Sequence, residues 1–240
     1  MTATVRSNGF QGSAQFWAES VKHLYVSSFR YFAAALSQRL LPPFSNLEAE
    51  AEQFAENEYA RLGTVPSLQE SDAADVADLA NDNAVTWYIS MAAVRQSVIN
   101  LHAVGLRHLF EQQVFDLVLH VPLRAAATAD IIKDLQALRD NGIHANEFES
   151  WQTLEELRLV CNVVKHAEGG AATRLRAIRP DLFVNPSVAN LPFLTRPGSV
   201  FQPLAGEDIY VREADIERYA DAVKSFWEQV SQALEQMSRP

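Results

Sequence analysis

The chain has 240 residues and a formal net charge of −10, with 48% hydrophobic and 21% charged residues. This balance is typical of a folded globular protein that can bury a sizeable core, and it argues against a disordered chain. The acidic charge argues against a protein that coats nucleic acid over its whole surface. The single cysteine, Cys161, excludes an internal disulfide framework and a thiolate zinc cluster.

The first residues, MTATVRSNGFQGSAQFW, lack the continuous apolar core of a signal peptide. No stretch reaches the ~18 uninterrupted apolar residues that a spanning helix needs. We therefore expect a cytoplasmic protein with no membrane contact.

Apolar residues recur at helical spacing from Ser13 to Leu41, which predicts a first helix that Pro42 and Pro43 end. A second, more polar helix is predicted from about Asn46 to Leu62. Phe16, Trp17 and Leu24 belong to the apolar stripe of the first helix, so we expect them in the core or in a dimer interface.

The third segment, Asp72 to Leu119, contains no proline. An unbroken helix of that length would span about 70 Å, which is long for a compact domain. We therefore expect a break or bend near residues 81–83 or at Gly105. The predicted inward face includes Trp87, Ile89, Val94, Val98, Leu101, Phe110, Val114 and Leu117.

A short helix is predicted from Ala129 to Arg139, because Asn141 and Gly142 form a helix-ending signal. Asn146 followed by Glu149 resembles a capping box, which predicts that the next helix starts there and runs to about His166. Gly169 and Gly170 would end that helix, and a further short helix would reach Ile178.

Five prolines and no helical period mark residues 180–206 as an irregular crossing, for which we expect a β-ribbon over Ser199–Phe201 and Asp208–Val211. A clear apolar stripe from Ile216 to Leu234 then predicts a last helix. The expected fold is a single all-α domain over residues 1–240. It would be a multi-helix bundle with a long central helix and a small irregular insertion over residues 180–211.

Positive charge gathers between Arg158 and Arg179, where five basic residues and one acidic residue give a net +4. At about 100° per residue, Arg158, Asn162 and His166 fall within an arc of about 80° on one helix face, with Lys165 beside it. Histidine can move a proton near neutral pH, and arginine and lysine can neutralise phosphate. These four residues are the candidate catalytic set for RNA cleavage.

Arg174, Arg176 and Arg179 follow the two glycines and are candidate contacts to a nucleic-acid backbone. Both sets also have a purely structural interpretation. Cations in the last turn of a helix interact favourably with its dipole, and surface arginines pair with the many carboxylates of an acidic protein.

The segment from Asn162 to His166, Asn-Val-Val-Lys-His, followed by glycines, resembles the motif helix of the HEPN superfamily. The polar residue of that motif matches Asn162 and its histidine matches His166, whereas Cys161 stands at the position of the usual arginine. The resemblance implies an all-α homodimer with its motif helices facing each other. It also implies a metal-independent endoribonuclease of bacterial antiviral defence or toxin–antitoxin systems.

Non-catalytic HEPN-like proteins leave a second hypothesis open, a helical interaction or regulatory subunit that binds a protein partner in a defence complex or a nucleic acid. Cys161 in the arginine position favours that alternative, and the positive charge favours RNA. Neither hypothesis requires a cofactor or a metal.

Two other arrangements are weaker candidates. Arg95 and His102 have the spacing of the motif, but Gln96 follows the arginine and the helix has no glycine-marked end. His108 and Glu111 would form a polar pocket beside the Asn162–His166 face, or only a surface pair on one helix.

Overall fold

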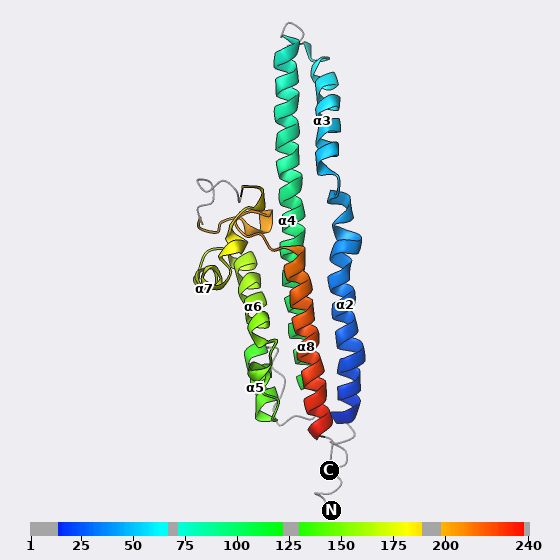
Figure 1. The fold of residues 1–240 in the computed structure, drawn as a ribbon, viewed down its shortest axis with the longest axis vertical. Helices are drawn as coiled ribbons and strands as arrows, with labels where there is room; N and C mark the ends of the chain where they lie inside the picture. Colours follow the sequence, from blue (N-terminus) through cyan, green and yellow to red (C-terminus); the bar gives the residue numbers. More distant parts are fainter. Residues whose placement is uncertain (1–13, 67–71, 122–129, 189–197, 238–240) are drawn as a thin grey trace, which may run out of the picture.

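The computed structural model describes residues 14–66, 72–121, 130–188 and 198–237. A long helix, α4 (Ala73–His120), runs through almost the whole length of the molecule, as Figure 1 shows. Helices α2 (Val26–Ala35), α6 (Trp151–His166) and α8 (Glu213–Met237) lie around its C-terminal half. Helix α3 (Leu47–Leu62) packs along its N-terminal half. The described residues form no strand, so the all-α prediction is confirmed for them.

The first predicted helix is confirmed over residues 14–40, but it contains two π-helical turns, η1 (Val21–Tyr25) and η2 (Leu36–Leu40). Each π turn inserts a residue and shifts the apolar stripe around the helix. Tyr25 and Leu36 are buried as a result, whereas Phe16 and Leu24 are 64% and 65% exposed. The expectation of a core position for Phe16 and Leu24 is therefore wrong in this structure.

The second predicted helix is confirmed as α3, and a 3₁₀ turn, η3 (Pro42–Phe44), precedes it. Helix α4 begins where Asp72 caps it, since the Asp72 carboxylate accepts a hydrogen bond from the backbone N–H of Ala74.

The expected break in α4 does not occur. Gly105 serves a different purpose, because a Cβ atom there would lie 2.7 Å from the ring of Phe32. The glycine allows close contact with the first helix, while α3 covers the part of α4 that extends beyond the bundle. The prediction was wrong because it assumed that all of α4 must fit inside a compact core.

Helix α5 (Ile131–Asp140) confirms the predicted short helix, and Gly142 follows it at φ +88°. The predicted capping box is wrong, because α6 starts at Trp151. Asn146 lies in a 3₁₀ turn, η5 (Ala145–Glu147), and Phe148 then takes an extended conformation that interrupts the helix. Helix α7 (Gly170–Ile178) confirms the helix predicted to reach Ile178.

The predicted β-ribbon is absent from the described part of the crossing, which folds into the 3₁₀ turns η6 (Pro180–Phe183), η7 (Pro186–Val188) and η8 (Pro203–Ala205). The two predicted strands bond elsewhere: the Glu168 N–H donates to the Val200 carbonyl, and the Tyr210 N–H donates to the Leu182 carbonyl. The Asp208 carboxylate accepts from the backbone N–H groups of Phe201 and Gln202, which a ribbon would have needed.

The crossing is fixed to α4 by Asn100, whose side chain is fully buried. Its amide donates to the carbonyls of Pro203 and Ile209, both at 3.0 Å, and its oxygen accepts from Gln96. Buried polar groups are stable when they are paired in this way. The main core then lies where α2, α4, α6 and α8 meet, around the fully buried Trp227 and Phe226 of α8.

Candidate functional site

The four predicted catalytic residues lie on the outer face of α6, while Leu157, Val160 and Val164 on the opposite face are fully buried in the core. His166 and Lys165 are exposed, and Arg158 and Asn162 are half-buried. The structure therefore brings these residues to one surface, as the helical spacing predicts.

Arg158 is already paired on that surface. Its guanidinium donates to the Glu155 carboxylate at 2.8 and 3.1 Å, and this pairing raises the Arg158 pKa. Among the described residues no side chain forms a hydrogen bond with His166 or an ion pair with Lys165. A histidine that works as an acid or base usually has a partner that orients its ring. His166 has no such partner within the described residues.

The backbone directly after His166 is strained. Ala167 has φ 60° and ψ −137°, a region that glycine fills in type II′ turns. A residue with a Cβ atom in a sparsely populated region costs about 1–3 kcal/mol, and such residues cluster at functional sites. The strained backbone at Ala167 is the conformational feature that supports a functional site at the C-terminal end of α6.

We expect Ala167→Gly to stabilise the protein by about 1 kcal/mol, because relief of the positive φ outweighs the extra freedom of glycine in the unfolded chain. Chemical denaturation of the two proteins measures the difference. Ala233→Gly, within α8, is the control and should destabilise by about 1 kcal/mol. Destabilisation by both changes would show that Ala167 is not strained.

Two of the three candidate nucleic-acid contacts take part in internal ion pairs. Arg176 donates two hydrogen bonds to the Glu168 carboxylate and one to the Gly198 carbonyl, and its guanidinium lies 4.8 Å from the Phe183 ring centre. The hydrogen bonds from Arg176 and from the Val200 N–H lower the pKa of Glu168 to about 2. Arg176 thus joins α7 to the crossing, whereas Arg174 is exposed.

Arg179 belongs to a buried network that sequence spacing did not indicate. Glu156 of α6 accepts hydrogen bonds from Arg179, from Arg218 and, at 2.7 Å, from the hydroxyl of Tyr219. Arg179 also donates to Asp181 at 2.9 Å and to Asp215 at 2.8 Å. Burial and the Glu156 carboxylate both raise the pKa of Tyr219. Each charge has a partner, so the network joins α6, η6 and α8 rather than offering a site.

The weaker candidates lie apart from these residues. Arg95 pairs with Glu213 at 2.5 Å, and His102 is buried with its ring stacked 4.4 Å from that of Phe32. Burial lowers the pKa of His102, which favours a neutral ring inside the core. His102 and Arg95 therefore do not form a joint site.

His108 and Glu111 form a surface pair at 4.0 Å, in which Glu111 also accepts from Arg107 at 2.8 Å. Cys161, as expected, is a core residue. Burial raises the pKa of its thiol to about 12, so it stays protonated at neutral pH.

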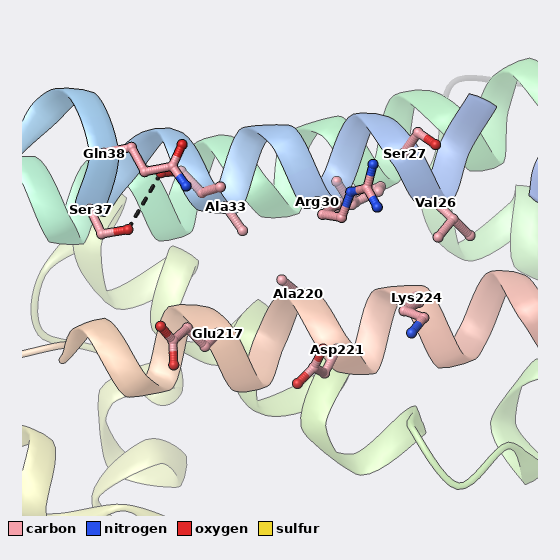
Figure 2. Close-up of a pocket in the computed structure, with 12 residues that line it drawn as sticks. Val26, Ser27, Arg30, Ala33, Ser37, Gln38, Glu217, Ala220, Asp221 and Lys224 are labelled. Atoms are coloured by element: carbon pink, nitrogen blue, oxygen red, sulfur yellow. Dashed lines mark hydrogen bonds between the residues drawn. The ribbon is translucent and has the colours of Figure 1, made fainter. Parts of the chain in front are cut away.

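A groove of about 540 Å³ lies between α2 and α8 (Figure 2). Small residues, Ala33 and Ala220, face each other across it, and Arg30, Asp221 and Lys224 lie along its sides. The residues that line it include no histidine or cysteine. Its lining mixes small apolar residues with charged ones, and these do not form a recognisable set of catalytic groups.

Across the described ranges no group of histidine, cysteine, aspartate and glutamate side chains is arranged to hold a metal ion. A search of the same residues finds no helix with the length and apolar content needed to cross a bilayer.

The most unusual feature is the arm, which we define as α3 together with residues 73–94 of α4. Figure 1 shows that it projects beyond the rest of the molecule. Its two helices pack side by side along their length, but few of the side chains between them are fully buried. Leu62, Val76 and Ala80 form a small separate cluster, and the rings of Phe54 and Trp87 stack at 5.9 Å.

The arm carries most of the net charge of the protein. From Leu47 to Val94, which is the arm with the segment that joins its helices, the sequence has ten acidic residues and one basic residue, Arg61, and this gives −9 of the total −10. The arm also exposes large apolar side chains: Val85 is 57%, Tyr88 36% and Ile89 60% exposed. Ile89 was predicted to face the core, and that prediction is wrong because α3 covers the opposite side of α4.

No protein family, curated protein or solved structure matches this chain. The likeness of α6 to the HEPN motif helix therefore depends on its own few residues. The class that the fold itself defines is an all-α protein in which a helical bundle carries an acidic two-helix arm.

Proposed function

We propose that this protein is a non-catalytic helical interaction subunit that binds a partner protein through its arm. The observation that carries the proposal is the exposure of Val85 and Ile89 on a projecting, strongly acidic helix pair. Contiguous exposed apolar side chains with a polar rim mark interaction surfaces in other proteins. A two-helix arm with so small a core of its own gains stability when a partner covers it.

The state of the α6 surface supports a role without catalysis. Arg158, Arg176 and Arg179 are all paired with carboxylates, so the net +4 segment offers fewer free cations than its sequence suggests. Lys165, His166 and Arg174 remain exposed. We further propose that the protein acts in the cytoplasm, in a bacterial defence or toxin-type complex. The resemblance to HEPN proteins and the single free thiol, Cys161, support this part of the proposal.

Site-specific photo-cross-linking tests the interaction proposal. A photoreactive amino acid at Ile89 should give one discrete adduct with a second protein in cells that naturally make this chain. The matched control is Ile178 of α7, which is 54% exposed and outside the arm, and it should give none. The absence of any adduct from Val85, Tyr88 and Ile89 alike would overturn the proposal.

A metal-independent endoribonuclease is the second candidate, with His166 and Asn162 acting on RNA and Arg158 and Lys165 assisting. The exposure of His166 beside the strained Ala167 favours it. HEPN-like enzymes build such a site from two copies, so this candidate also implies a homodimer with the α6 helices facing each other.

Cleavage of total RNA and tRNA without added metal distinguishes the two proposals. The interaction proposal predicts no cleavage by wild type or by His166→Ala. Cleavage by wild type that falls at least about 100-fold in His166→Ala would establish the nuclease instead. His108→Ala, another exposed histidine, is the control and should leave the rate unchanged.

A further inference from the structure

We propose that the outer face of α4 in the arm binds an amphipathic, basic helix of a partner protein. This inference rests on the proposed interaction function and names the chemistry of the partner. We define the arm face by five residues, Asp75, Asp78, Asp82, Val85 and Ile89, all of which are exposed. Acidic side chains occupy its first half and apolar side chains its second half.

The five residues form one straight stripe because of their spacing. At about 100° per residue they fall within an arc of about 80° on α4. Val76, Ala80 and Ala84, which are buried, lie on the other side of the helix toward α3. No described basic side chain pairs with Asp75, Asp78 or Asp82. As far as the described residues go, the face is therefore open to a partner along its whole length.

The crossing extends the apolar half of the arm face. The Ser97 hydroxyl donates to the Leu204 carbonyl, and Gly206 lies against the backbone of Ala93. Leu204 is 49% exposed there, one to two turns after Ile89 along α4. A partner helix would thus meet apolar side chains from two separate elements at this end.

The length of the face sets the length of the partner segment. From Asp75 to Ala92 the helix rises about 25 Å, which matches a partner helix of about 17 residues. Helices that bind a groove or a flat helix surface usually contact it through residues spaced at i, i+3, i+4 and i+7. Val85, Tyr88, Ile89 and Ala92 have that spacing.

Charge identifies the kind of partner. A net −9 over residues 47–94 repels nucleic acid, anionic lipid and the arm of a second copy alike. A helix with lysine or arginine beside its apolar residues would instead place cations on Asp78 and Asp82 while its apolar residues cover Val85 and Ile89. Complementary charge of this kind sets orientation and speeds association.

Binding of defined peptides to the whole protein tests this proposal. The probe is a labelled 18-residue helical peptide with leucine on one face over half its length and lysine on the same face over the other half. A scrambled peptide of equal composition and charge, with no amphipathic face, is the control. Fluorescence anisotropy should show at least about tenfold tighter binding of the first peptide. Equal binding would overturn the proposal, since it would reflect charge alone.

Matched variants then locate the contact. Val85→Ser with Ile89→Ser should weaken binding at least about tenfold, because the apolar contact is lost. Ile132→Ser with Ile178→Ser removes equally exposed residues elsewhere and should have no effect. Circular dichroism confirms that each variant is folded.

A second pair of variants tests the acidic half of the arm face. Asp78→Asn with Asp82→Asn should weaken binding and reduce its salt dependence, whereas Glu50→Gln with Glu52→Gln, the same charge change on α3, should do so much less. Equal effects of the two pairs would show a diffuse field instead of a docking face.

Sedimentation tests for a second copy on the same face. A dimer of the wild-type protein that Ile89→Ser dissociates would also overturn the proposal, because a second copy would then cover the arm face. Cross-linking at Ile89 without peptide binding would leave the interaction function standing and reject only the basic helix.

Discussion

Glu156→Gln is expected to lower the free energy of unfolding by about 3 kcal/mol, because the nearly buried Glu156 carboxylate binds both Arg179 and Arg218 and also accepts from Tyr219. The Glu156 and Arg179 side chains are only 11% and 18% exposed, so water does little to screen them. Glutamine keeps the shape of the side chain but removes its charge, and its N–H donors would face those of Arg179 and Arg218. Urea denaturation followed by circular dichroism measures the loss.

The adjacent residue provides the control. Glu155→Gln removes the partner of Arg158, but Glu155 and Arg158 are 32% and 29% exposed, so we expect a loss below about 1 kcal/mol. A similar small loss for Glu156→Gln would show that Asp181 and Asp215 alone suffice to hold Arg179 in place.

The destabilisation caused by Glu156→Gln should also differ between regions of the molecule. Arg179 directly precedes η6 and Asp181 lies in it, whereas Asp215 and Arg218 lie in α8. The network therefore holds the start of the crossing against the last helix. Weakening it should speed exchange in α7 and in the start of the crossing more than in α3, which the network does not touch. Hydrogen exchange would show that difference, since regions with fewer buried contacts open first.

Much of the helical fold follows from local sequence, and α8 shows why. Its apolar residues from Ile216 to Leu234 repeat with the period of the helix, so one strong pattern indicates both the element and its buried face. Ile89 shows the limit of that argument. The same period placed it on an inward face, yet it is 60% exposed, because the pattern cannot tell which side of α4 another helix will cover.

The candidate site also has one part that local sequence predicts and one part that it does not. Arg158, Asn162 and His166 share a face because helix geometry alone fixes residues four apart. Asp181 is a local partner of Arg179, but Glu156 and Asp215 reach it only when distant segments pack. No local pattern predicts such pairs, and so the positive charge counted along the sequence overstated the positive charge at the surface.

Gly206→Ala is expected to cost about 3 kcal/mol or more, the second large effect. Gly206 has φ +82°, and a Cβ atom there would lie 1.9 Å from the Ala93 carbonyl oxygen. That oxygen belongs to the backbone of a long helix, so it cannot move aside as a flexible side chain would. The crossing would have to lift from α4, which would strain the bonds from Asn100 to Pro203 and Ile209. Thermal and urea denaturation both measure the effect.

Gly142→Ala separates the two causes of that loss. Gly142 has nearly the same backbone conformation, φ +88°, but nothing lies within 4 Å of the added Cβ position, so it should cost only about 1 kcal/mol. The difference between the two variants is therefore the cost of parting the crossing from α4. Equal losses would mean that Gly206 does not lie against Ala93, and Leu204 would then no longer extend the arm face.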